Sequence, residues 1–121
     1  MAVDRTAVTR WVEDYVSAWG SNDPQEIGGL FTADATYFDK PQSEPWIGRE
    51  TIVEEWLRRK DEPGQWSFRY EVLAVDPDEA LGVVRGWTDY VDPPKAYHNL
   101  WLIRLNQDSA CSEFTEWWLT A

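Results

Sequence analysis

The feature that most constrains the fold of this chain is a change in the spacing of its apolar residues near residue 65. Before that point, apolar side chains recur every three or four residues, which is the period of a helix. After it, four segments rich in aromatic and β-branched residues have the composition of strands. A chain with helices first and strands afterwards predicts an α+β domain.

The first half predicts three helices. The first covers residues 8–19, where Val8, Trp11, Val12, Tyr15, Val16 and Trp19 form one broad apolar stripe. Gly20 offers a left-handed stop after it, and Asp23 followed by Pro24 begins a short second helix. A third is expected to start near Arg49 and to end near Lys60.

The second half predicts four strands, over residues 66–76, 80–91, 96–106 and 111–120. Short turns rich in Asp, Asn and Pro connect them, so an antiparallel meander is expected. A further strand-like run, Ala35 to Phe38, should lie along the edge of this sheet. It ends in a single acid, Asp39.

Length and charge restrict what the protein binds. The 121 residues predict a single domain over 1–121, and the formal net charge of −11 disfavours nucleic acid and anionic membrane surfaces as partners. No signal peptide or membrane span is expected, and the one cysteine cannot form an internal disulfide, so a cytoplasmic location is expected. One His and one Cys give no metal-ligand spacing, and neither a metal nor another cofactor is expected.

Asp39 has two interpretations from the residues alone. It either caps the turn before Pro41 or pairs with Arg49, or it lines a pocket beside Tyr37, Phe38 and Trp46. In the second case the carboxylate would be poorly solvated, and poor solvation makes a carboxylate a better proton acceptor.

The segments "YVSAWGSNDPQEIGGLFTADATYFD", "GRETIVEEW", "NLWLIRL" and "EFTEWWL" resemble, in order, elements of the nuclear transport factor 2-like superfamily. This superfamily includes SnoaL-like polyketide cyclases and ketosteroid isomerases. The resemblance covers essentially the whole chain. It implies a cone-shaped, curved antiparallel sheet wrapped around a long N-terminal helix. The open end of such a cone admits a small apolar ligand or substrate, and two chains often form a homodimer.

The resemblance also implies roles for individual residues. Asp39 matches the place of the general base of ketosteroid isomerases, and Tyr15 matches the tyrosine that stabilises the developing oxyanion. Where those enzymes have a strand aspartate that completes the oxyanion site, this chain has Trp101. Steroid isomerisation itself is therefore not expected.

Strand alternation adds residues to the pocket, because every second side chain faces the same side of a sheet. Glu116 shares a face with two aromatic residues of the last strand, one of which, Trp118, matches a pocket tryptophan of the isomerases. The predicted catalytic residues are Asp39, Tyr15 and Glu116. The predicted ligand-binding residues are Trp19, Trp46, Trp56, Asn99, Trp101, Phe114 and Trp118.

Other residues are assigned away from the pocket. His98 is expected on the outer face with Trp87 and Trp117 as candidate dimer contacts, and Cys111 is expected to be a packed thiol. The facing of Arg85, Trp87 and Asp89 stays open, since Gly86 is compatible with a bulge.

Two functions remain in play. The first is an enzyme that performs acid-base chemistry, of isomerase, cyclase or lyase type, on a small apolar carbonyl compound. The second is a non-catalytic ligand-binding or dimerisation module with the same fold, which a pocket filled by its own tryptophans would favour. Fold alone does not choose between them.

Overall fold

A computed structural model describes residues 3–121 and shows an α+β fold. In chain order its elements are α1 (Arg5–Ser21), α2 (Pro24–Gly28), β1 (Phe31–Phe38), β2 (Trp46–Ile47), α3 (Arg49–Arg58), β3 (Trp66–Asp76), β4 (Leu81–Val91), β5 (Pro94–Leu105) and β6 (Cys111–Thr120). None of the helices within these residues is long and apolar enough to cross a bilayer.

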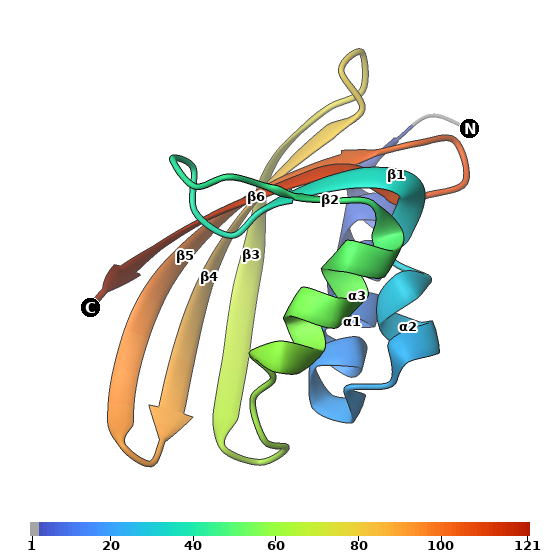
Figure 1. The fold of residues 1–121 in the computed structure, drawn as a ribbon. Coiled ribbons are helices and arrows are strands. Elements are labelled where there is room, and N and C mark those ends of the chain that lie inside the picture. Colours follow the sequence, from blue (N-terminus) through green and yellow to red (C-terminus); the bar gives the residue numbers. More distant parts are fainter. Residues whose placement is uncertain (1–2) are drawn as a thin grey trace.

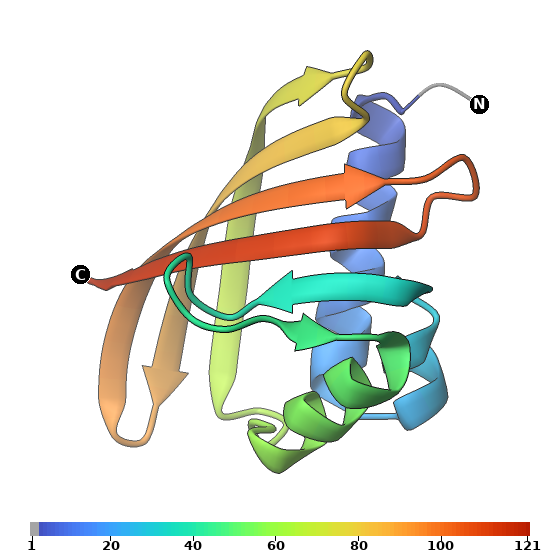
Figure 2. The ribbon, with the colours of Figure 1, turned by 45° about the horizontal axis from the view of Figure 1, so that its top comes forward.

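The described strands form one sheet in the order β2-β1-β6-β5-β4-β3. The predicted meander of the last four strands is confirmed, since β3, β4, β5 and β6 pair antiparallel in sequence order. The predicted strand beside it is β1, which pairs with β6 in the parallel direction. Figures 1 and 2 show this sheet curving around the helices, which lie on its concave side.

Helix α1 is the central rod of the fold. Its first turn is capped by Asp4, whose side chain accepts a hydrogen bond from the backbone N–H of Ala7 at 2.9 Å. The expectation that Gly20 ends the helix in a left-handed conformation is wrong, because Gly20 is helical and Asn22 takes that conformation with φ of 53°. Asparagine is the residue that most often replaces glycine there.

Two glycines let other elements approach β4 closely. A Cβ at Gly82 would lie 2.7 Å from the side chain of Val8 in α1, and a Cβ at Gly86 would lie 2.5 Å from the ring of Phe68. Gly86 pairs regularly with both neighbouring strands, so it marks no bulge, and the register shift lies in β3 between Val72 and Ala74. The ring of Phe68 fills the space that a side chain at Gly86 would occupy.

This register settles the facing of β4. The buried positions of β4 alternate along Gly82, Val84, Gly86 and Thr88, which places these residues on the concave side. Arg85, Trp87 and Asp89 therefore face outward. The ring of Trp87 carries the guanidinium groups of Arg69 and Arg85 at 4.1 and 5.1 Å from its centre.

Aromatic rings dominate the core between α1 and the sheet. The Tyr15 ring lies 4.6 Å from that of Trp101, 4.8 Å from that of Trp56 and 5.6 Å from that of Phe114, measured between centroids. Trp101 and Phe114 are almost completely buried. These rings fill the inner part of the cone, directly beneath the candidate site.

Candidate active site

A cavity of about 320 Å³ opens on the concave side of the sheet, between the strands and the ends of α1 and α3. This volume lies within the range of small-molecule pockets. Its lining is mostly aromatic, with a minority of charged and polar groups. The lining residues are Tyr15, Trp19, Tyr37, Asp39, Trp46, Trp56, Arg59, Lys60, Asp61, Thr88, Tyr90, Tyr97, Asn99, Trp101, Glu116 and Trp118.

Glu116 is held in the cavity by a chain of hydrogen bonds across three strands. Its Oε2 accepts from Trp101 Nε1 at 2.8 Å and from Asn99 Nδ2 at 3.0 Å. Asn99 in turn accepts at Oδ1 from the hydroxyl of Thr88 at 2.8 Å. These bonds fix the carboxyl group through one oxygen and leave Oε1 without a hydrogen-bond partner among residues 3–121.

The environment of Glu116 favours its protonated form. The pKa of Glu116 is raised to about 7: burial is the main cause of the rise, the bonds from Trp101 and Asn99 oppose it, and the carboxylate of Asp39 adds a smaller rise. Because both N–H donors occupy Oε2, a proton on Glu116 belongs on Oε1. Glu116 can thus present an O–H to a ligand near neutral pH.

Tyr15 and Tyr37 form a second polar group in the same cavity. Their hydroxyl oxygens lie 2.9 Å apart, and burial raises the pKa of both tyrosines well above its usual value. Both hydroxyls therefore stay protonated. One of the two protons makes the bond between them, and the other is left for a hydrogen bond to a ligand.

Asp39 lies half-buried at the wall of the cavity, directly after β1. Within the part of the chain that the structure describes, its carboxylate makes no ion pair and accepts no side-chain or backbone hydrogen bond. Arg49, the alternative partner, donates instead to the backbone carbonyl of Phe31 from Nε at 3.1 Å and Nη2 at 2.9 Å. Asp39 is thus free to meet a ligand.

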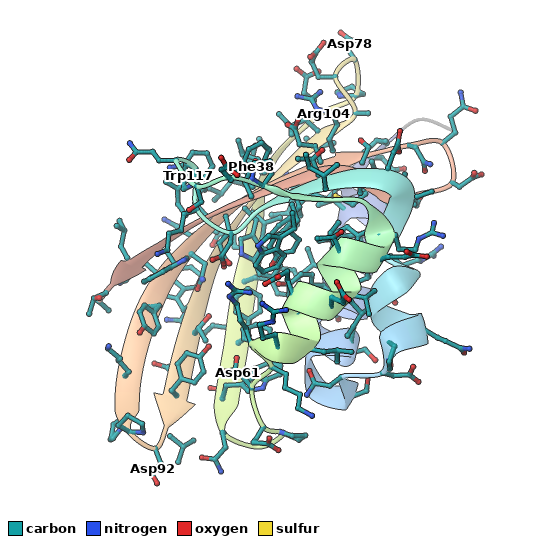
Figure 3. All side chains as sticks on the ribbon, viewed as in Figure 1. Phe38, Asp61, Asp78, Asp92, Arg104 and Trp117 are labelled. Atoms are coloured by element: carbon teal, nitrogen blue, oxygen red, sulfur yellow. The ribbon has the colours of Figure 1, made fainter. Side chains whose placement is uncertain are left out.

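A third carboxylate, Asp61, lines the cavity from the segment after α3 (Figure 3). Its Oδ2 accepts from Trp19 Nε1 at 2.9 Å and from the hydroxyl of Tyr90 at 3.0 Å. Its backbone carbonyl accepts from Asn22 Nδ2 at 3.0 Å. Asp61 thereby ties the end of α1 and strand β4 to this segment.

Cations line the same cavity or cover its aromatic walls. The guanidinium of Arg59 lies 5.2 Å from the centre of the Trp46 ring and pairs with Glu55. The ammonium of Lys40 lies 5.3 Å from the centre of the Trp118 ring. Positive charge therefore accompanies the three carboxylates of the lining.

Nine of the ten predicted site residues line this one cavity, and Phe114 does not. Phe114 is completely buried in the core, where its ring contacts those of Trp11 and Tyr37. Alternation placed Phe114 on the correct face of β6, but the side chains of α1 cover it. Asn99 was predicted to bind a ligand, and both ends of its amide are instead used by Glu116 and Thr88.

Several lining residues were not predicted. Alternation contained a signal for Tyr37, which is two residues before Asp39, and for Tyr97, which is two residues before Asn99. Thr88 and Tyr90 could be predicted only if it was known which side chains of β4 face the concave side, and the sequence left this open. Asp61 sits in a charged turn after a helix, and nothing in its sequence context distinguishes it from a solvated acid.

Residues outside the cavity agree with simpler roles. Cys111 is buried, which raises the pKa of its thiol far above the usual value, as for a packed thiol. His98 is exposed on the outer face, where it stands between Trp87 and Leu119 in the strand register. Among residues 3–121, no group of three or more His, Cys, Asp or Glu side chains is placed to hold a metal ion.

Comparisons with known proteins agree with this fold. The family model described as a SnoaL-like domain matches residues 12–111. No curated protein matches the sequence.

Solved structures of the same fold share little sequence with the chain. SalBIII, described as an epoxide hydrolase/cyclase-like enzyme in pyran ring formation in polyether salinomycin, is 14% identical, with a TM-score of 0.74, 96% of this chain and 93% of that chain covered. A candidate ketosteroid isomerase from Kribbella flavida DSM 17836 is 21% identical, with a TM-score of 0.73, 98% of this chain and 82% of that chain covered. A protein of unknown function with a cystatin-like fold from Methylobium petroleophilum PM1 is 12% identical, with a TM-score of 0.73 and coverage of 100% and 81%.

Proposed function

This chain belongs to the SnoaL-like domain family, and from that membership and the cavity we propose that it is an enzyme of acid-base chemistry on a small, apolar carbonyl compound. Asp39 accepts a proton from the carbon next to the carbonyl group. Glu116 donates a hydrogen bond or a proton to the carbonyl oxygen. The observation that carries the proposal is the placement of a free carboxylate, Asp39, and a carboxyl group favoured in its protonated form, Glu116, in one cavity.

The proposed reaction conserves its proton. The C–H bond next to the carbonyl breaks as Asp39 takes the proton, and the electron pair moves to the carbonyl oxygen. The O–H of Glu116 and the free proton of the Tyr15–Tyr37 pair stabilise the resulting oxyanion. Return of the proton from Asp39 to the same carbon gives exchange, and its transfer to another carbon conjugated with the enolate completes an isomerisation. In a cyclisation the enolate carbon bonds to a second carbonyl carbon of the same molecule, the electron pair of that C=O bond moves to its oxygen, and this oxygen takes the proton from Asp39.

The expected strand aspartate of the isomerases is absent, and Glu116 is proposed to take its part. Trp101, which occupies that position in the sequence, donates to Glu116 Oε2 at 2.8 Å. The carboxyl group therefore comes from the neighbouring strand and Trp101 orients it. This arrangement supports acid-base catalysis rather than a pocket filled by its own tryptophans, because a cavity of about 320 Å³ stays open between the rings.

The test is exchange of the α-protons of 2-tetralone, an activated bicyclic ketone, into deuterated water, followed by NMR. We expect the protein to accelerate this exchange. Asp39→Asn should lower the exchange rate of the bound ketone by about a hundredfold or more, with little change in the affinity for the ketone. Asp34→Asn is the matched control, because Asp34 is an exposed carboxylate on β1, the strand that Asp39 follows.

Two results would contradict the enzymatic proposal. Equal exchange by wild type and Asp39→Asn would mean that Asp39 is no base. Binding of the ketone without any exchange would identify the chain as a ligand-binding module of the same fold.

We also propose that the chain forms a homodimer through the outer face of the sheet. The outer patch consists of Trp87, His98, Leu100, Trp117 and Leu119, which are neighbours in the strand register. Trp117 is 36% exposed and Leu119 is 68% exposed. Figure 3 shows Trp117 on the side of the sheet away from the helices. Large exposed apolar side chains grouped in this way are typical of a protein interface.

A further inference from the structure

Asp61 has a hydrogen-bonding arrangement that repeats the one around Glu116. Two donors, Trp19 Nε1 and the Tyr90 hydroxyl, both bind Oδ2 of Asp61, as Trp101 and Asn99 both bind Oε2 of Glu116. In each carboxyl group one oxygen is fully used and the other has no hydrogen-bond partner among the described residues. Neither free oxygen is sealed away from open space.

The two groups belong to one cavity but come from different parts of the fold. Glu116 stands on β6, whereas Asp61 follows α3 and is bound to the end of α1 and to β4. Aromatic side chains, among them Trp56 and Trp101, line the same cavity. A ligand that fills the cavity therefore contacts aromatic walls and can reach two separate carboxyl groups, those of Glu116 and Asp61.

The free oxygen of Asp61 determines which kind of ligand group can bind to it. A carboxylate oxygen accepts hydrogen bonds, so its partner must be a donor. Arg59 and Lys60 precede Asp61 in the chain and line the same cavity, and their two positive charges disfavour a positively charged ligand group there. A neutral hydroxyl satisfies the carboxylate without this repulsion.

We propose that Asp61 is a specificity-determining residue that binds a hydroxyl group of the substrate, so that the substrate class is an apolar cyclic ketone with a hydroxyl group remote from its carbonyl. This inference rests on the proposed function, because it assumes that the carbonyl group of the same substrate accepts a hydrogen bond from Glu116. Asp61 takes no part in the proton transfer. Trp19 and Tyr90 act as positioning residues that turn its free oxygen toward the ligand.

The test compares three bicyclic ketones, namely 2-tetralone, 6-hydroxy-2-tetralone and 6-methoxy-2-tetralone, in binding to the whole protein by calorimetry. The hydroxyl compound should bind at least about tenfold more tightly than the methoxy compound, because a hydrogen bond to a charged acceptor replaces a contact that has no donor. Asp61→Asn should abolish this preference. Glu62→Gln, at the exposed neighbouring acid, should preserve it.

The Asp61→Asn variant is expected to keep its fold, so its binding can be compared with that of wild type. The amide oxygen can accept the bonds from Trp19 and Tyr90, and the amide nitrogen then takes the place of the free oxygen. The link between α1, β4 and the segment after α3 is therefore retained, while the acceptor that faces the ligand becomes a donor. An unchanged melting temperature would confirm that the link survives.

The outcomes separate this inference from the proposed function. If all three ketones bind and exchange their α-protons but the hydroxyl gives no advantage, Asp61 is only a structural link and this inference is wrong. The same holds if 6-aminomethyl-2-tetralone, which carries an ammonium group, binds more tightly than the hydroxyl compound. If no ketone binds, the proposed function fails and this inference fails with it.

Discussion

At the scale of single residues, the site depends on how its carboxyl groups are solvated and bonded. Among residues 3–121 the carboxylate of Asp39 has no hydrogen-bond or ion-pair partner, whereas Glu116 receives two N–H donors on one oxygen and is favoured as the neutral acid. Two acids in one cavity thereby acquire different chemistry. This difference is what a pair needs to act as proton acceptor and proton donor at the same pH.

The raised pKa of Glu116 predicts how stability depends on pH. Between the ordinary value of 4.5 and the folded value of about 7, the folded protein binds more protons than the unfolded chain, so the free energy of unfolding falls as pH rises through this window. Glu116→Gln removes this dependence. We compare the free energy of unfolding of the variant with that of wild type, measured by urea unfolding at pH 5 and at pH 8. The difference should shift in favour of the variant by on the order of 1–3 kcal/mol between pH 5 and pH 8.

The control for this change is Glu113→Gln, which removes an exposed carboxylate from the same strand. If Glu113→Gln gives the same gain, the effect comes from the total charge of −11 rather than from Glu116. A wild-type curve that is flat between pH 5 and pH 8 would show that Glu116 is ionised throughout.

At the scale of helices and strands, the packing of β4 against its neighbours rests on glycine. Gly86→Ala should destabilise the protein by about 1–3 kcal/mol, because the added methyl group would meet the Phe68 ring at 2.5 Å. Gly20→Ala is a matched change in α1, where the added Cβ would have no described atom within 4 Å beyond its own turn of the helix. It should stabilise the protein by about 0.5–1 kcal/mol, because alanine favours a helix. Thermal unfolding measures both changes.

The opposite ordering of these two variants would contradict the packing described here. Destabilisation by Gly20→Ala would indicate that Gly20 needs a left-handed conformation after all. A neutral Gly86→Ala would indicate that the Phe68 ring moves aside at no cost.

The elements were predictable from sequence because their signals are local. The apolar stripe of α1 and the aromatic and β-branched runs of the last four strands depend on neighbours a few residues away, and each matches an observed element. The end of α1 was misplaced by two residues, since an asparagine carries out the function expected of glycine.

The site was predictable only in part because it depends on long-range packing. Alternation and the resemblance brought Asp39, Tyr15 and Glu116 to one face, and the structure places all three at one cavity. Whether a face-sharing residue lines the cavity or lies beneath it depends on what α1 covers, as Phe114 illustrates. Asp61 owes its position to partners from α1 and β4, which no local pattern connects.

At the scale of the whole molecule, the proposed homodimer places the outer patch between two chains and leaves the cavity mouths on the other side of each sheet. Leu119→Lys, at a residue that is 68% exposed in the single chain, should break the pair by burying charges. Leu73→Lys is the control, because Leu73 is 41% exposed at the bulge of β3, the far edge strand. Sedimentation at micromolar concentration should report a dimer for wild type and Leu73→Lys and a monomer for Leu119→Lys.

A monomeric wild type at the same concentration would reject the dimer. A dimer that survives Leu119→Lys would move the interface to another surface.

The parallel pairing of β1 with β6 decides when the two proposed catalytic acids can meet during folding. Strand β1 comes from the first third of the chain, and its partner in the meander is the last strand to be synthesised. Contacts between such distant segments form slowly, and β1 is synthesised before β6, so Phe31 and Tyr37 at first have no completed sheet to pack against. Asp39 directly follows β1 and Glu116 lies in the middle of β6, next to the paired residues Phe38 and Thr115, so the two acids come together only when these strands pair. A chain in which β1 and β6 have not paired therefore lacks the pair of acids on which the proposed activity depends.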